Sequence, residues 1–478
     1  MLFFYFTTKI TLSKSVKEGL IILNSIMQMK LFLLFFFILF IILFITINLS
    51  SSIDLPSAAL PSSSGYLTVN QTTGSFIFYT YYEAQRPISS LQRTPLVIWL
   101  QGGPGCSSMI GNFYELGPWR IVPYQGTVKL EQNPGSWNRL FGLLFLDNPI
   151  GSGFSIAASS DEIPRDQHQV AKHLFAAIRD FIRINPGFGS RPVYITGESY
   201  AGKYVPAIGY YILKKNPELD YDERVNLAGL AIGDGLTDPR TQVMTHSDHA
   251  YYLGLINEKQ RTQLELAQLE AVRLIDRGLW VEATNARNHV LHMLQNMTGL
   301  ATLYDLRRKI PYQDDLVGKL LNNAGVKAAL GASPSIVWDS CNDVVGDALH
   351  ADVMKSVRFV VDDILLKSTT KLLLYQGQCD LRDGVVSAEA WMKKLKWDGI
   401  DEFLDAERKV WKVNGELAGY VQKSRDLSHV VVLDAGHLVP TDQAVHSQAM
   451  IEDWILERGL FVEEESLYDG RTSPRAAL

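Results

Sequence analysis

The chain has 478 residues, of which 47% are hydrophobic and 20% are charged; this balance is typical of globular proteins and excludes an intrinsically disordered chain. The length is enough for one large domain or two ordinary ones. The formal net charge is −6 and no block of basic residues occurs, so we expect no nucleic-acid partner, because phosphates require a stripe of Lys and Arg side chains.

The leader, residues 1–50, differs in composition from the rest. Its residues 31–47 form an apolar run that follows Lys30 and precedes three serines. This pattern predicts a secretory signal peptide, entry into the secretory pathway and no stable membrane association after cleavage. Translation from Met27 or Met29 would leave the earlier residues outside the protein. A signal anchor is the alternative, because the run is nearly long enough to span a bilayer.

Short apolar segments alternate with stretches of helical spacing in residues 51–236. This alternation predicts an α/β fold with a mostly parallel central sheet that is covered by helices on both faces. The expected strands are 65–70, 75–82, 95–100, 142–146, 192–196 and 227–232, and the expected helices are 166–184 and 201–215.

The strand signals stop between residues 237 and 340, where residues 257–297 have helical spacing and no proline. Further strands are expected at 371–375 and 429–433. We interpret 237–340 as a helical cap inserted into the sheet domain; a separate helical domain is the alternative, but the strands on both sides must rejoin one sheet. The two parts of the core are then 51–236 and 341–478.

A sharp turn is predicted at Gly197-Glu198-Ser199-Tyr200-Ala201-Gly202, between an expected strand and an expected helix. A turn of the G-x-S-x-G type in this context exposes its serine as a nucleophile. The turn requires small residues two positions before and after the serine, and Gly197 and Ala201 meet this requirement. The helix N-terminus then favours a developing anion at Ser199.

A serine nucleophile needs a base, and in folds with such a turn the chain order is Ser, acid, His. Three histidines follow the returning strands: His429, His437 and His446. His429 begins a strand and His446 lies in a helical stretch, whereas His437 lies in a loop after a strand, where catalytic residues collect. We therefore expect His437 to be the base.

The acid that orients the base is expected in the loop after strand 371–375. Asp380 lies there, just beyond the Gly377 turn, and Asp383 is the alternative. An oxyanion also needs two preorganised N–H donors. We expect one from Tyr200 and the other from Gly103 in the glycine-rich loop after strand 95–100, because glycines allow close approach of the backbone.

Long motifs around these residues resemble those of the serine carboxypeptidases. They are W-L-Q-G-G-P-G-C-S-S from Trp99, Y-E-L-G-P from Tyr114, G-E-S-Y-A-G-K-Y-V-P from Gly197 and A-G-H-L-V-P from Ala435. The stretch Y-Q-G-Q-C-D-L from Tyr375 is similar to the retinoid-inducible branch and its plant relatives. The resemblance, from about Gly65 to Leu460, implies an α/β-hydrolase fold and the triad Ser199, Asp380 and His437, with Gly103 as second oxyanion donor.

The resemblance also implies a subsite for the terminal carboxylate of a peptide. Its members here are Gln101, Gly102, Glu115 and Glu198, with Gln101 where the family more often has Asn. Two glutamates can face a carboxylate only when they carry protons, and clustered buried acids hold their protons to higher pH. We therefore expect activity at acidic pH, in the extracellular space or in a vacuole or lysosome.

The three cysteines allow one internal disulfide, and the resemblance pairs Cys106 with Cys341 and leaves Cys379 free. Asn70 and Asn296 begin glycosylation sequons. A homodimer is expected only by analogy with the family.

The resulting function is that of a serine-type carboxypeptidase, which removes residues from the C-terminus of peptides or proteins through an acyl-enzyme intermediate. One alternative is an acyltransferase of the same family with the same triad. Another is a non-catalytic protective or binding protein on the same scaffold. Neither a metal motif of the H-E-x-x-H type nor a dinucleotide fingerprint occurs in the sequence, so we expect no metal and no cofactor.

Overall fold

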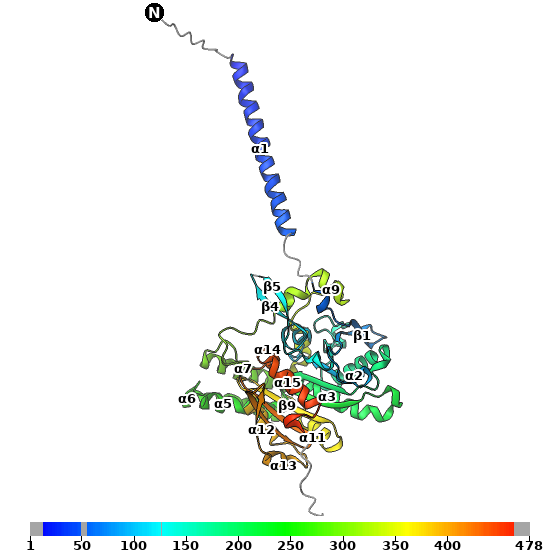
Figure 1. Ribbon diagram of the computed structural model, residues 1–478. Coiled ribbons are helices and arrows are strands. Elements are labelled where there is room, and N and C mark those ends of the chain that lie inside the picture. The colour runs from blue at the N-terminus through cyan, green and yellow to red at the C-terminus, as the bar shows by residue number, and fades with distance from the viewer. Residues whose placement is uncertain (1–12, 49–54, 126, 463–478) are drawn as a thin grey trace, which may run out of the picture. The chain divides into compact units, whose positions relative to one another are not determined.

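The computed structural model describes residues 13–48, 55–125 and 127–462 (Figure 1). The chain divides into two compact units, Met1–Asp54 and Leu55–Leu478. In the described part of the first unit, the regular element is the helix α1 (Lys14–Asn48). The second unit contains the sheet and every candidate site residue.

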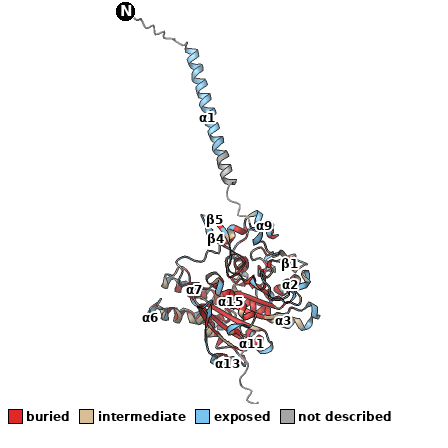
Figure 2. Ribbon diagram, in the orientation of Figure 1, coloured by how far each residue is buried: buried red, intermediate tan, exposed pale blue. Residues whose placement is uncertain are grey.

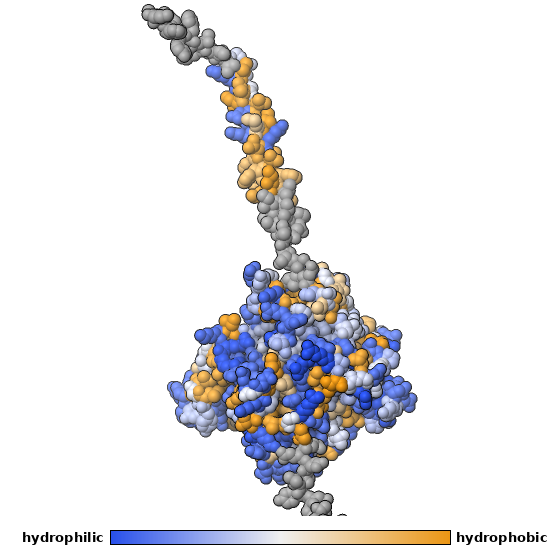
Figure 3. Space-filling model, in the orientation of Figure 1, coloured by the Kyte–Doolittle hydropathy of each residue, from blue (hydrophilic) through white to orange (hydrophobic). Residues whose placement is uncertain are grey.

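Helix α1 begins well before the apolar run at residues 31–47. Its segment Lys14–Phe40 is long and apolar enough to cross a membrane, and its exposed surface carries many apolar side chains with some hydrophilic ones between them (Figure 3). A signal sequence and a signal anchor both have this length and composition. The helix is therefore consistent with the predicted signal peptide and equally with the anchor.

A ten-stranded sheet forms the centre of the second unit, in the order β1-β2-β6-β3-β7-β8-β9-β12-β11-β10. The six strands from β6 to β12 in this order are parallel, and the two strands at each edge join antiparallel. The strands are β1 (Ser63–Asn70), β2 (Ser75–Tyr82), β3 (Leu96–Leu100), β6 (Gly142–Leu146), β7 (Val193–Glu198), β8 (Leu227–Gly233), β9 (Lys371–Gly377), β10 (Lys409–Val413), β11 (Glu416–Ser424) and β12 (Leu427–Val432). A separate hairpin pairs β4 (Trp119–Tyr124) with β5 (Thr127–Gln132).

Helices cover both faces of this sheet, whose central strands are buried (Figure 2). Neighbouring residues of a strand point to opposite faces: Ile195 packs in the apolar cluster that includes α3 (Ala201–Lys215), whereas the Tyr194 ring contacts Trp454 of α15 (Ala444–Ile455). The predicted α/β fold with a mostly parallel sheet is confirmed. The other core helices are α2 (Gln167–Ile184), α12 (Val385–Met392), α13 (Ile400–Asp405) and α14 (Val439–Asp442).

A helical insertion, defined here as α4 to α11, separates β8 from β9. Its two long helices pack against each other, and the first is capped at Asn257, whose side chain accepts from the Gln260 amide. The members are α4 (Pro239–Gln242), α5 (His246–Tyr252), α6 (Glu258–Asp276), α7 (Trp280–Thr298), α8 (Leu316–Leu321), α9 (Ala324–Leu330), α10 (Asp343–Leu349) and α11 (Arg358–Lys367). The division at residues 237 and 340 stays a prediction, because residues of the second unit cluster together.

A disulfide joins Cys106, in the loop after β3, to Cys341, just before α10. Cys379 is free and buried, and burial raises the pKa of its thiol to about 11. Of the two sequon asparagines, Asn70 accepts amide hydrogens in the turn after β1, and Asn296 is exposed on α7. Glycosylation of either stays a prediction.

Candidate active site

The candidate residues lie at one edge of the sheet, where five neighbouring parallel strands end. Carboxyl ends of parallel strands are where α/β proteins build their sites. The residues that follow β3, β7, β8, β9 and β12 are, in that order, Gln101 to Gly103, Ser199, Asp234, Asp380 and His437.

Ser199 has the strained backbone of a nucleophile turn. Its φ is +61°, in the left-handed region that non-glycine residues seldom occupy. A Cβ at Gly197 would lie 2.4 Å from the carbonyl oxygen of Leu100, and one at Gly202 would lie 2.7 Å from the amide nitrogen of Leu236. The tight packing requires these glycines and holds Ser199 at the start of α3.

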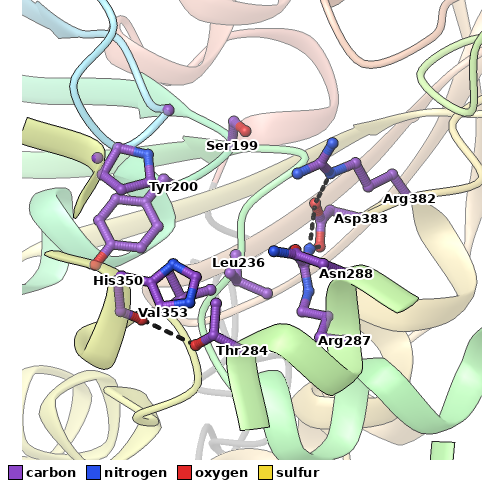
Figure 4. Close-up of a pocket in the computed structure, with 13 residues that line it drawn as sticks. Ser199, Tyr200, Leu236, Thr284, Arg287, Asn288, His350, Val353, Arg382 and Asp383 are labelled. Atoms are coloured by element: carbon purple, nitrogen blue, oxygen red, sulfur yellow. Dashed lines mark hydrogen bonds and ion pairs between the residues drawn. The ribbon is translucent and has the colours of Figure 1, made fainter. Parts of the chain in front are cut away.

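The glycine-rich loop after β3 runs directly against this turn. A Cβ at Gly102 would lie 2.6 Å from the amide nitrogen of Tyr200 and 2.8 Å from the Cβ of Ser199. Gly103 has φ of +112° and lines a cavity together with Ser199 and Tyr200 (Figure 4). The backbone of this loop can therefore approach a substrate carbonyl beside Ser199.

His437 and Asp380 form a buried hydrogen-bonded pair. The Nδ1 atom of His437 lies 2.7 Å from Oδ2 of Asp380, and the amides of Arg382 and Asp383 donate to the same carboxylate at 2.7 and 3.2 Å. Burial alone would raise the pKa of Asp380, but the charge and hydrogen bond of His437 lower it below its usual value. The Nε2 atom of His437 is buried and has no hydrogen-bond partner among the described residues.

Asp234 is a further site residue that the sequence analysis missed. It follows β8 directly, is fully buried, and accepts from the amide of Gly377 at 3.1 and 3.2 Å. Burial and the charge of Asp380 raise the pKa of Asp234 well above its usual value, so Asp234 keeps a proton while Asp380 is charged. Asp234, Asp380 and His437 each place a possible metal-ligand atom within 4.8 Å of the others, and the oxygens of both carboxylates already accept backbone amide hydrogens.

Gln101, Glu115 and Glu198 form a second buried group. Gln101 Nε2 donates to Glu115 Oε1 at 3.1 Å and to Glu198 Oε1 at 2.7 Å, and Gln101 Oε1 accepts from Trp99 Nε1 at 2.9 Å. Both hydrogens of the Gln101 amide are thus used by the glutamates. The two carboxyl groups hydrogen-bond to each other. Their Oε2 atoms are buried and have no other hydrogen-bond partner among the described residues, so they are the atoms left for a ligand.

The two glutamates cannot both be charged. Burial raises the pKa of Glu115 to about 8. Burial, and then the charge of Glu115, raise the pKa of Glu198 well above its usual value. At acidic and neutral pH the group therefore holds protons that it can donate to an anion.

Two segments of the helical insertion reach the site. The ring of Tyr304 packs on the ring of His437 with centroids 4.5 Å apart, and the amide of His437 donates to the Tyr304 carbonyl at 2.7 Å. The hydroxyl of Tyr200 donates to Asp352 at 2.7 Å. No sequence signal identified Tyr304 or Asp352, because their contacts depend on how the insertion folds back over the sheet.

A family model described as serine carboxypeptidase matches residues 54–457. The chain belongs to the serine carboxypeptidase family. It is 59% identical over 407 residues to serine carboxypeptidase-like 50 of Arabidopsis thaliana, covering 85% of this chain and 90% of that protein. It is 33% identical to the human probable serine carboxypeptidase CPVL, covering 84% and 85%. The prediction that the chain belongs to this family, and that it is similar to plant members, is confirmed.

Among solved structures, the chain is similar to the prohormone-processing carboxypeptidase Kex1 of Saccharomyces cerevisiae. The TM-score is 0.74 at 28% identity, covering 84% of this chain and 93% of that one. The protein is thus a serine carboxypeptidase-type hydrolase with the α/β-hydrolase fold, and this family acts on the C-termini of peptides.

Proposed function

We propose that Ser199, Asp380 and His437 are the catalytic triad of a serine carboxypeptidase. Ser199 attacks the carbonyl of the last peptide bond, and His437 takes its proton and passes it to the leaving amine. Asp380 holds the imidazole in the required orientation, as the 2.7 Å contact with Nδ1 supports. Water then hydrolyses the acyl-enzyme, with His437 again as base.

The amides of Gly103 and Tyr200 are proposed to stabilise the oxyanion. Both residues line the cavity at Ser199, and Tyr200 stands at the start of α3, where the helix dipole favours negative charge. Hydrogen bonds that strengthen as the oxyanion forms lower the barrier rather than only the KM.

The terminal carboxylate of the peptide is proposed to bind at Glu115 and Glu198, with Gly102 beside them. The observation that carries this function is the buried pair of proton-holding glutamates, whose Oε2 atoms have no other partner among the described residues. Gln101 then acts as the clamp that orients both glutamates. An acid pair of this kind selects a free carboxylate and rejects an amide.

The test compares N-blocked dipeptides with a free or an amidated C-terminus at pH 5, with the released amino acid or amino-acid amide measured. The free acids should be cleaved at least about tenfold faster, since one hydrogen bond to a charged group is worth about 1.5–3 kcal/mol. Equal cleavage would remove the carboxylate subsite. Transfer to a small alcohol in place of hydrolysis would favour the acyltransferase alternative.

The Glu198→Gln variant provides a matched comparison. A glutamine side chain donates without a titrating proton, so kcat/KM should fall less at alkaline pH than in the wild type. An identical pH profile in both proteins would exclude this role of Glu198.

The protein is proposed to act outside the cell or in a vacuole or lysosome after signal cleavage, without membrane attachment. A homodimer is proposed by family analogy alone.

A further inference from the structure

A cavity of about 210 Å³ opens beside Ser199 (Figure 4). Its lining includes the proposed oxyanion donors, but Gln101, Glu115 and Glu198 are not among its described lining residues. Pockets for drug-sized ligands are larger, about 300–1,000 Å³, so this cavity suits one amino-acid side chain. Its other walls come from α7, from the loop after β9, and from residues 346–353, where His350 is a further titratable side chain at the cavity.

Charged side chains from α7 and from the loop after β9 meet inside the cavity. Arg287 of α7 lies with Nη2 at 3.4 and 3.5 Å from the carboxylate oxygens of Asp383, and Arg382 lies with Nε at 3.7 Å from the same carboxylate. Figure 4 shows both arginines converging on Asp383. The single carboxylate of Asp383 faces the two guanidinium groups, so these three side chains together have a net charge of about +1 at pH 6.

Neither arginine is fully satisfied by these contacts. The contacts are long for charge-assisted hydrogen bonds, which are usually about 2.7–2.9 Å. Arg287 is only 4% exposed, and the Nε atom of Arg382 is buried without a hydrogen-bond partner among the described residues. Arg382 also lies over the Tyr304 ring, 4.7 Å from its centroid, which fixes the guanidinium next to the site.

We propose that this cavity binds the side chain of the penultimate residue, on the acyl side of the scissile bond, and that Arg382 and Arg287 select an acidic side chain there. This rests on the proposed function, since a C-terminal residue held at Glu115 and Glu198 leaves the cavity to the residue before it. A carboxylate from the substrate would complete the coordination of both arginines. A cationic side chain would meet two like charges, and Asp383 is already shared between them.

The test uses N-blocked dipeptides Glu-Leu, Gln-Leu and Lys-Leu at pH 6, with released leucine measured. We expect kcat/KM for Glu-Leu to exceed that for Gln-Leu by about tenfold, which is typical of one hydrogen bond to a charged group. Lys-Leu should be slower than Gln-Leu. The Glu/Gln ratio should fall at pH 4, because a free glutamate side chain has a pKa of about 4.3.

Variants assign the preference to the cavity. Arg382→Gln should bring the Glu/Gln ratio close to one, and Asp383→Asn should raise it. The backbone amides of Arg382 and Asp383 also donate to Asp380, so either variant could disturb the triad. A disturbed triad would slow Glu-Leu and Gln-Leu equally, so the Glu/Gln ratio still reports on the cavity alone. Arg240→Gln, at an arginine paired with Asp276 on the exposed surface, is the control and should leave the ratio unchanged.

The outcomes separate this inference from the function on which it rests. No release from any peptide overturns both. Release from all three at equal rates, or fastest from Lys-Leu, overturns the acidic preference alone. An unchanged ratio in Arg382→Gln also overturns it, and the wild-type ratio with its pH dependence decides the matter where a variant does not fold.

Discussion

Glu115 should make the folded protein less stable as the pH rises from acidic to neutral. Burial raises its pKa from 4.5 to about 8. Between these two values the folded state binds more protons than the unfolded state, so the free energy of unfolding decreases with rising pH. A pKa difference of one corresponds to about 1.4 kcal/mol, which gives a loss of about 3 kcal/mol from this group between pH 4 and pH 7.

The perturbation that isolates this effect is Glu115→Gln. The amide oxygen can still accept from Gln101, while the titrating proton is removed. The variant should therefore gain about 3 kcal/mol relative to the wild type between pH 4 and pH 7. Part of this gain will be shared with Glu198, because the two acids titrate as a pair.

The assay is denaturant unfolding at pH 4, 5.5 and 7, followed by tryptophan fluorescence. Glu282→Gln on α7, where the side chain is exposed, is the matched control and should differ from the wild type equally at each pH. A difference between Glu115→Gln and the wild type that stays constant across the range would refute the buried, protonated state of Glu115.

Three other perturbations test the rest of the site and the fold. Ser199→Ala should lower kcat by roughly 10⁶-fold in peptide assays. Ser199→Gly should be equally inactive but about 1 kcal/mol more stable to denaturant than Ser199→Ala, because glycine accepts the positive φ. Equal stabilities of the two variants would argue against backbone strain. Asp234→Asn should keep kcat/KM within about fivefold of the wild type, since an amide replaces a protonated carboxyl, whereas a large loss would indicate a charged Asp234. Peptide mapping without reduction should find Cys106 bonded to Cys341, and Cys106→Ser should lower the free energy of unfolding by up to about 5 kcal/mol; a Cys106–Cys379 peptide would contradict the structure.

The strands with strong apolar runs were predictable from the sequence. Strands β2 and β6 and helix α3 have the predicted bounds. Strands β10 and β11 were not predicted; β10 is the edge strand, and β11 beside it buries only four of its nine residues. Their apolar residues are too scattered to form a recognisable period, and their pairing depends on β12.

The candidate site divides in the same way. Asp380 and His437 could be selected because each lies in a loop after a buried strand, and the same rule applied to strand 227–232 would have found Asp234. Arg287 and Tyr304 could not be found, because each reaches the site from the insertion. A local sequence pattern does not predict which side of a helix in the insertion packs against a loop that is distant in the sequence.

Some site residues stand on the central sheet and others on the helical insertion, and this difference decides which of them can be substituted during evolution. Ser199, Asp380 and His437 stand on strand ends fixed by the buried sheet, so replacing a neighbouring core residue endangers folding and chemistry together. Arg287 stands on α7, which contributes to the cavity wall without belonging to the sheet. Substitutions along that helix can therefore produce new substrate preferences in descendants of this chain while the reaction itself is inherited unchanged.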